Sequence, residues 1–307
     1  MTAVAAAPAG VTRRRRRRPS WDRSAPAFVG PAFLLAAAFL LLPMALAFFY
    51  SFTKIASLSG ETSFIGLDNY RTMFTDPTFY RSLVNTAVFT VLTVPVGLAI
   101  GLALAVLFNS VLPARKLFRT IVYLPLVISG VAVGLIGTFM YNETVGVLDK
   151  VLVLIGLPSV PWQSNGAGAF LSIVLITLWI RVGFNMIIYL AGLQAVPVEL
   201  QESAQVEGAS AWQRFRFITV PLLGPSTFFL LVMNVIYSFQ VFDTVYVLTN
   251  GGPGSATEVL GTYAYKTAFG ATRDQGYGAA IGVVIFFLTL AFTIFQWRFN
   301  RTRDEVA

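Results

Sequence analysis

The stretch PVELQESAQVEGASAWQRFRFITVPLLG, residues 197–224, is the segment on which the interpretation of the fold depends. It connects two long apolar segments, yet its pattern is that of two short helices rather than of a simple polar loop. Pro197 suits the first turn of a helix, and Glu199 and Glu202 favour the positive end of the helix dipole. Gly208 is placed to end that helix, because glycine accepts the left-handed conformation there. We therefore predict a first helix that ends near Gly208 and a second helix over residues 209–220.

Long apolar segments lie on both sides of this stretch. A helix that crosses a bilayer needs about 20 mostly apolar residues, and residues 28–52, 84–108, 118–141, 168–196, 225–248 and 277–297 meet this requirement. The mean hydropathy of the chain is +0.72. Charged residues make up 12% of it, which is half the usual share in a soluble domain. The sequence predicts an all-α integral membrane protein, with a basic tail over residues 1–24 and six transmembrane helices within residues 25–307.

The distribution of positive charge predicts the orientation of these helices. If the N-terminus lies in the cytoplasm, 15 of the 22 Lys and Arg residues fall on the cytoplasmic side and 6 on the outer side, with Arg181 inside a span. This bias follows the positive-inside rule and predicts that both termini are cytoplasmic. Residues 197–224 then face the cytoplasm.

The first 24 residues carry a run of arginines from Arg13 to Arg18. We interpret this run as a signal that fixes membrane orientation, although binding to nucleic acid or to particular lipids is an alternative. A cleavable signal peptide is a further alternative, since residues 45–47 resemble a cleavage site. The apolar stretch of residues 25–52 is, however, longer than the roughly 7–15 residues of a cleavable segment.

Several classes of function are excluded by composition. The chain has no cysteine and no histidine, which excludes disulfides, the usual zinc and iron sites, and Ser-His-Asp or Cys-His catalysis. A phosphate-binding P-loop requires a Gly-Lys pair followed by Ser or Thr. None of the four lysines follows a glycine, so the chain has no ATP site of this type.

The charge pattern of the first predicted cytoplasmic helix favours docking on another protein. Leu200, Ala204 and Val206 could sit in a groove, while Glu202 offers a carboxylate to a basic partner. The alternative is a helix that lies on the membrane surface. Such helices prefer a polar face rich in Lys and Arg, whereas this one carries three glutamates and no base.

At these residues the sequence resembles a known family. The E-S-A-x-x-x-G-A pattern from Glu202 to Ala209, with Ile218 and Pro221-Leu222, is similar to the EAA loop of binding-protein-dependent ABC importer permeases. The resemblance is to the carbohydrate-uptake branch, of the maltose and glycerol-3-phosphate type. It extends to residues 64–86, 123–149 and 248–260 and covers about nine-tenths of the chain. Ser203 departs from the pattern, since the family usually has alanine there.

The resemblance implies a type I ABC importer permease of six helices with a cytoplasmic coupling helix. It implies a subunit of the inner membrane that is not itself an enzyme and holds no cofactor, since partner ATPase subunits would bind ATP and Mg²⁺. The implied partners are a homologous permease, two ATP-binding subunits and an extracytoplasmic solute-binding protein, which would dock near residues 68–80 and 251–257. The residues implied to contact the ATPase are Glu199, Glu202, Ser203, Ala204, Glu207, Gly208 and Ala209.

Polar residues inside the predicted spans suggest where a solute could pass, because such residues usually face the bundle interior. On one continuous helix over residues 225–248, four polar residues share a face and Asp243 lies off it, near the outer interface. Arg181, near the middle of the fourth span, could contact solute or act as scaffold. Hydrogen bonds between helices are the alternative role for the fifth-span residues. The candidate path residues are Arg181, Asn185, Asn234, Tyr237, Ser238 and Gln240.

We therefore expect a permease subunit that forms half of a pathway for a sugar or related polyol. Glycerol 3-phosphate or a glycerophosphodiester is the alternative solute for the same kind of complex. An ion-coupled secondary transporter is less favoured, because the spans contain one acid, Asp243, and no histidine to relay protons. A membrane enzyme would need a catalytic constellation at membrane depth, and the sequence offers none.

Overall fold

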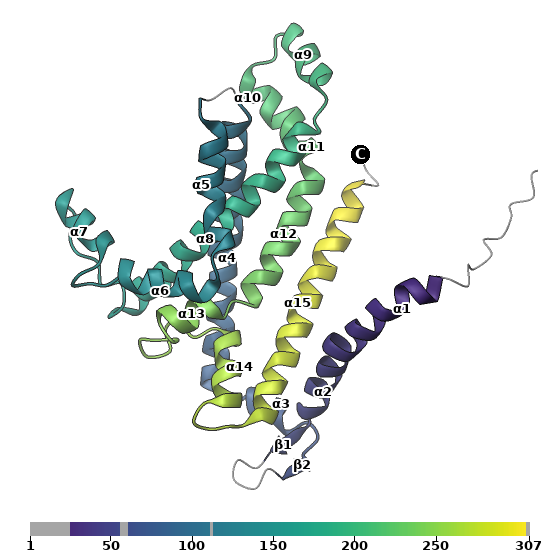
Figure 1. The fold of residues 1–307 in the computed structure, drawn as a ribbon, viewed down its shortest axis with the longest axis vertical. Coiled ribbons are helices and arrows are strands. Elements are labelled where there is room, and N and C mark those ends of the chain that lie inside the picture. Colours follow the sequence, from purple (N-terminus) through teal and green to yellow (C-terminus); the bar gives the residue numbers. More distant parts are fainter. Residues whose placement is uncertain (1–24, 56–60, 111–112, 305–307) are drawn as a thin grey trace, which may run out of the picture. The chain divides into compact units, whose positions relative to one another are not determined.

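The computed structural model describes residues 25–55, 61–110 and 113–304 (Figure 1). The basic tail, residues 1–24, lies outside the described residues. The chain divides into two units, residues 1–46 and 47–307. Each unit is described by itself.

The first unit is helical over its described part. Helix α1 (Ala25–Ala36) continues through a π-helical turn η1 (Ala37–Leu41) into α2 (Leu42–Tyr50), whose last residues belong to the second unit. The π-helical turn ends two residues before Pro43, whose ring conflicts with the normal hydrogen-bond pattern of the preceding turn. Residues 28–50 are long and apolar enough to cross a membrane, as expected for the first span.

The core of the second unit is built on two long helices that pack along each other, α4 (Pro77–Asn109) and α8 (Gly166–Gln194). Glycines on α4 allow the close approach: a Cβ atom added at Gly101 would lie 2.5 Å from the Cβ of Asn185 on α8. Helix α12 (Gly224–Phe239) packs against α4 and α15 (Gln275–Asp304). Helix α4 continues through Pro95 and begins seven residues before the predicted span, because Asp76 caps it and Pro77 starts it.

The third predicted span is not one helix. It consists of α5 (Arg115–Val127) and α6 (Gly130–Met140), which are bent by 103° relative to each other. Ile128 and Ser129 are extended, and the Ser129 hydroxyl caps α6 by accepting from the amide of Ala132. Pro125 lies in the last turn of α5, and the helix ends two residues after it.

The expected helix over residues 225–248 is wrong beyond Phe239. Helix α12 ends there, residues 240–242 leave the helical conformation, and the short helix α13 (Asp243–Leu248) follows. Gly261 at the start of α14 (Leu260–Phe269) lies against this break, since a Cβ atom there would be 2.8 Å from the carbonyl oxygen of Val241. A further bend of 63° separates α12 from the helical segment 211–222.

Residues 197–224 form the two short helices that the sequence predicts. Helix α9 (Val198–Val206) is followed by Gly208 with φ +87°, and then by α10 (Ala211–Arg214), the π-helical turn η2 (Phe215–Thr219) and α11 (Val220–Leu222). Ser210 and Gln213 form a capping box at the start of α10.

The opposite end of the second unit holds the connections that we predict to face outward (Figure 1). They comprise the strand pair β1 (Thr53–Ile55) and β2 (Thr62–Phe64), helix α3 (Asp68–Met73) and α14. Helix α7 (Val147–Leu154) follows α6. In the described part of the chain, four helices are long and apolar enough to span a membrane, or six if each bent pair counts as one span.

Candidate functional site

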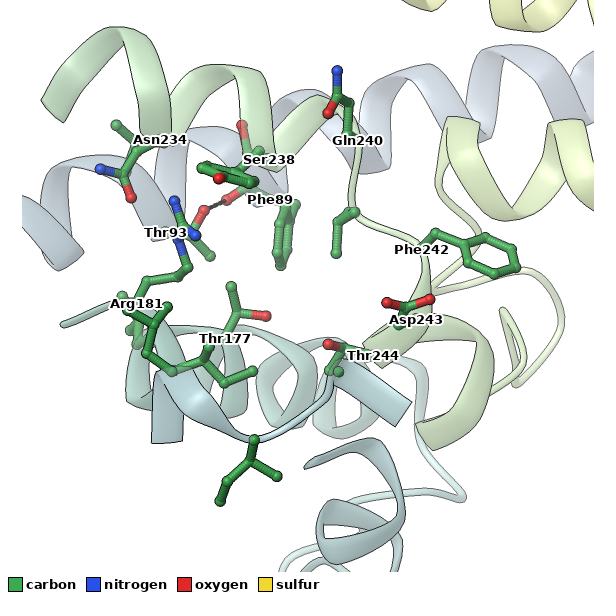
Figure 2. A pocket seen from close by; sticks show the side chains of 18 residues that line it. Phe89, Thr93, Thr177, Arg181, Asn234, Ser238, Gln240, Phe242, Asp243 and Thr244 are labelled. Atoms are coloured by element: carbon green, nitrogen blue, oxygen red, sulfur yellow. Dashed lines mark hydrogen bonds between the residues drawn. The ribbon is translucent and has the colours of Figure 1, made fainter. Parts of the chain in front are cut away.

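A cavity of about 330 Å³ lies in the second unit, between α8, α12 and the break that follows α12 (Figure 2). Its wall is formed by side chains from α4, α8, α12 and α13, together with residues around the break between α5 and α6. The volume falls in the range of small-molecule sites. Five of the six predicted path residues line the cavity: Arg181, Asn234, Tyr237, Ser238 and Gln240.

The α8 wall of the cavity contains polar atoms without partners. The guanidinium carbon of Arg181 lies 3.7 Å from the centre of the Tyr237 ring, a cation–π geometry. The buried Nε and one terminal nitrogen of Arg181 have no hydrogen-bond partner. The same is true of the Thr177 hydroxyl, one helical turn away. The α8 wall therefore presents donors that the described protein does not use.

The α12 wall is fixed by hydrogen bonds to the neighbouring helices. The side-chain amide of Asn234 donates to Asn185 Oδ1 at 2.9 Å and to the carbonyl oxygen of Leu230 at 2.8 Å. The hydroxyl of Ser238 accepts from Thr90 at 2.9 Å. Asn185 is fully buried and does not line the cavity. The structure thus places Asn185 behind the wall, where it positions Asn234.

Asp243 lies in the cavity wall, contrary to its predicted place off the polar face. Because α12 ends at Phe239, the helical spacing used for that prediction does not apply to Asp243. Its carboxylate packs on Gly130 at the start of α6, where an added Cβ atom would lie 2.9 Å from Oδ2. Arg181 and Asp243 come from different sides of the cavity (Figure 2), and neither takes part in the salt bridges of the described residues.

The predicted coupling segment is held by bonds between its two helices. The amide of Ala209 donates to the Ala204 carbonyl at 2.9 Å, which closes the turn at Gly208. A guanidinium nitrogen of Arg214 donates to the Ala209 carbonyl at 2.8 Å, and the Gln201 amide donates to the Thr219 hydroxyl at 3.0 Å. The helix pair is therefore a defined unit rather than two independent turns.

Helix α9 exposes both its carboxylates and its apolar side chains. It has no buried residue, and Val206 is 89% exposed. Glu199, Glu202, Ser203, Glu207 and Gly208 are exposed, whereas Ala204 and Ala209 are half-buried at the turn. Leu200 is also exposed, so the apolar and acidic groups proposed for docking are both accessible on the isolated chain.

The connections at the opposite end are joined by contacts that the sequence did not predict. Arg81 and Asn85 of α4 donate to the backbone carbonyls of Gly254 and Glu258, at 3.0 and 2.9 Å. These bonds attach residues 251–258 to the start of α4. The buried Glu258 also forms a 2.6 Å ion pair with Lys266. Residues 251–258 are thus attached to α4 at positions that directly follow the predicted docking segment 68–80.

Asp76 is the centre of a second set of contacts at this end. Its carboxylate accepts hydrogen bonds from the hydroxyls of Tyr263 and Tyr277 and from the amide of Thr78. Burial alone would raise the pKa of Asp76, but these hydrogen bonds outweigh burial and hold the pKa below its usual value. Burial and the Asp76 charge raise the pKa of Tyr263. Local sequence patterns do not predict this cluster, because Asp76 lies far along the chain from both Tyr263 and Tyr277.

Comparison with known proteins identifies the family. Residues 94–304 match the model of the family described as "Binding-protein-dependent transport system inner membrane component". The chain is 35% identical to the sulfoquinovosyl glycerol transport system permease protein SmoG of Agrobacterium fabrum, over 90% of each chain. It is 33% identical to the trehalose/maltose transport system permease protein MalF of Thermococcus litoralis, over 90% of this chain and 92% of that one.

A solved structure has the same fold at similar length. A chain of a bacterial ABC transporter involved in the import of the acidic polysaccharide alginate superposes with a TM-score of 0.78, at 29% identity, over 90% of this chain and 94% of that chain. The overall fold of this chain is thus already known from a transporter. The chain is a member of the family of inner membrane components of binding-protein-dependent transport systems, and it is an ABC importer permease subunit.

Proposed function

We propose that this chain forms half of the translocation pathway of an ATP-driven importer for a carbohydrate or related polyol. The observation that carries the proposal is the cavity beside the break after Phe239. Hydrogen-bonding side chains and the aromatic ring of Tyr237 line this cavity together. Sugars need this combination, because they present hydroxyls along their edges and weakly polar faces. The relatives that transport sulfoquinovosyl glycerol, trehalose and maltose support the same solute class.

The second part of the proposal concerns energy coupling. The pair α9–α10 would seat in a cleft of an ATP-binding subunit, with Glu202 facing a basic group and Val206 in an apolar contact. Its exposure, and its place at the end of the unit opposite to α3 and α14, support this arrangement (Figure 1). ATP and Mg²⁺ would be bound by that partner, and closure of two such partners would move the two permease subunits as rigid bodies.

The complex would contain a second permease, two ATP-binding subunits and an extracytoplasmic binding protein. The solved alginate transporter in complex with a periplasmic protein supports the last of these partners. Residues 68–80 and 251–257 are where we expect that protein to dock. Both termini of this chain would then lie in the cytoplasm.

Charge reversal at Glu202 tests the coupling proposal. In vesicles that contain the complete importer, we expect Glu202→Lys to abolish most ATP-dependent uptake, while the complex remains assembled. Glu202→Gln should have a smaller effect, because it removes the charge without reversing it. Lys150→Glu is the matched control, since Lys150 is an exposed residue of α7 outside the helix pair. Full coupled uptake in Glu202→Lys would refute the docking proposal.

The same vesicles separate this function from ion-coupled transport. The proposal predicts uptake only when ATP is hydrolysed and all partners are present. Uptake by this chain alone, driven by an ion gradient, would support a secondary transporter instead. Glycerol 3-phosphate and a glycerophosphodiester belong in the solute panel, because the same kind of complex could carry them.

A further inference from the structure

The charge inside the cavity narrows the class of solute, an inference that rests on the proposed function. Arg181 brings a positive charge to the α8 wall, and its guanidinium carbon lies 3.7 Å from the centre of the Tyr237 ring and 5.5 Å from that of Phe184. No carboxylate of the described residues forms a salt bridge with it. Arg181 is half-buried, but two of its guanidinium nitrogens are buried without a partner. Burying part of a charged group without an anionic partner is costly, so a site of this kind favours a ligand that brings the missing charge.

The unused hydrogen-bonding atoms of the α8 wall point to the same ligand chemistry. Two guanidinium nitrogens of Arg181 are buried without an acceptor, and the Thr177 hydroxyl has no partner. The Asn234 amide nitrogen already donates two hydrogen bonds, to Asn185 and Leu230. The donors of the α8 wall that have no acceptor are those of Arg181 and Thr177. A planar guanidinium with two free donors matches the two oxygens of a carboxylate, phosphate or sulfonate.

The negative group of the cavity lies apart from Arg181. Asp243 is exposed and comes from the side of α13, where its carboxylate packs on Gly130 (Figure 2). Tyr237 and Gln240 are exposed as well, whereas Asn234 and Ser238 are buried. The cavity is therefore polarised. Unpaired donors lie on the α8 wall, whereas the exposed residues on the side of α13 supply a carboxylate and neutral polar groups.

We propose that this cavity selects an acidic carbohydrate, whose anionic group binds Arg181 and Thr177 while its hydroxyls face Gln240 and Asp243. The ring of Tyr237, which stacks on the guanidinium of Arg181, would fix the orientation of that group toward the anionic group of the solute. A carboxylate, a phosphate ester and a sulfonate share this chemistry. Separate sugar acids that carry each of these groups distinguish the three anionic groups.

The test uses the purified permease pair with its ATP-binding subunits but without the binding protein, so that the selectivity of that protein cannot contribute. Thermal unfolding of this chain is followed with glucose, glucuronate, glucose 6-phosphate and glucose 6-sulfonate, at equal ionic strength. A ligand at about ten times its Kd should raise the Tm by about 2–4 °C. We expect this rise with at least one acid and not with glucose.

Variants assign the effect to the cavity. Arg181→Gln should abolish the rise caused by the acid, and Arg181→Lys should retain part of it. Arg119→Gln is the matched control, because Arg119 is a partly buried arginine of α5 that does not line the cavity. A rise with glucose equal to that with the acids, no rise with any acid, or an acid effect that survives in Arg181→Gln would each overturn the inference. If Arg181→Gln does not fold, the wild-type comparison of acids with glucose decides alone.

The proposed function has a separate readout. ATP-dependent uptake of glucose or another neutral sugar by the complete importer, without any effect of the acids on Tm, would leave the importer proposal intact and refute only the acidic selectivity. Absence of ATP-dependent uptake would count against the importer proposal itself.

Discussion

The side-chain amide of Asn234 on α12 donates a 2.9 Å hydrogen bond to Asn185 on α8, and Asn185 in turn lies against Gly101 of α4. Three helices thus meet at one fully buried amide. The contact lies directly behind the cavity wall, so packing at Gly101 and the position of Asn234 are linked through Asn185.

Gly101→Ala should destabilise the chain, because the new methyl group would lie 2.5 Å from the Cβ of Asn185 and 3.2 Å from its backbone carbonyl carbon. Overpacking of this kind costs about 1–3 kcal/mol. The measurement is thermal or denaturant unfolding of the purified chain in detergent. Gly282→Ala on α15 is the control, since nothing lies within 4 Å of the added Cβ there. Equal stability of the two variants would contradict the close packing of α4 on α8.

A double-mutant cycle measures the interaction free energy between the side-chain amides of Asn234 and Asn185. Asn234→Leu and Asn185→Leu should each destabilise the chain, because each leaves a buried amide without its partner. Hydrogen bonds between membrane helices contribute about 0.6 kcal/mol on average and up to about 1.7 kcal/mol. We expect the double variant to lose less stability than the sum of the single variants. Strict additivity would mean that the two amides do not interact.

Acid should weaken the contact between α4, α14 and α15 through Asp76. The pKa of Asp76 is lower in the folded chain than in the unfolded chain, so its stabilising effect is complete above the unfolded value of about 4. It is lost as the pH falls through the folded pKa. Unfolding measured from about pH 7 to pH 3 should therefore show an acid-dependent loss that is smaller in Asp76→Asn.

Tyr263→Phe tests whether the phenol hydrogen bonds to Asp76 cause the acid-dependent loss of stability, because it removes one of the two. It should reduce the acid-dependent loss without abolishing it. If Asp76→Asn kept the full acid dependence, the loss would have to come from other carboxylates.

Gly208→Ala should impair coupling by straining the turn between α9 and α10. Gly208 has φ +87° with open space around it, so the cost is conformational and amounts to about 1–2 kcal/mol. We expect ATP-dependent uptake to fall while solute-independent ATP hydrolysis continues. Gly224→Ala is the control, because Gly224 has ordinary backbone angles and no close neighbour. Identical uptake by both variants would show that the turn geometry is unimportant.

Hydropathy and local signals were sufficient to predict much of this architecture. The first, second, fourth and sixth spans appear as helices at their predicted places, and the stop at Gly208 is confirmed by its positive φ. These features depend on residues close together in sequence, such as the acids and the glycine of the coupling segment.

The breaks in the third and fifth segments could not be placed by the same reasoning. An apolar run such as residues 225–248 has the same hydropathy whether it is straight or broken at Phe239. The break depends on tertiary contacts, including the approach of Gly261 to the carbonyl of Val241. Asp243 was therefore assigned to the wrong place. The Asp76 cluster was missed for the same reason, since Asp76 is more than 180 residues from both Tyr263 and Tyr277.

The central claim is that residues 197–224 connect a membrane-embedded pathway to a separate ATP-hydrolysing subunit. The chain has no cysteine, so a single cysteine at the exposed Ser203 can carry a photo-crosslinker in an otherwise unlabelled chain. Thr72→Cys on α3, at the other end of the unit, is the control. In intact cells we predict that Ser203→Cys crosslinks to an ATP-binding subunit and resists a membrane-impermeant maleimide, whereas Thr72→Cys reacts with the maleimide. Labelling of Ser203→Cys from outside the cell, with no crosslink to such a subunit, would contradict the account.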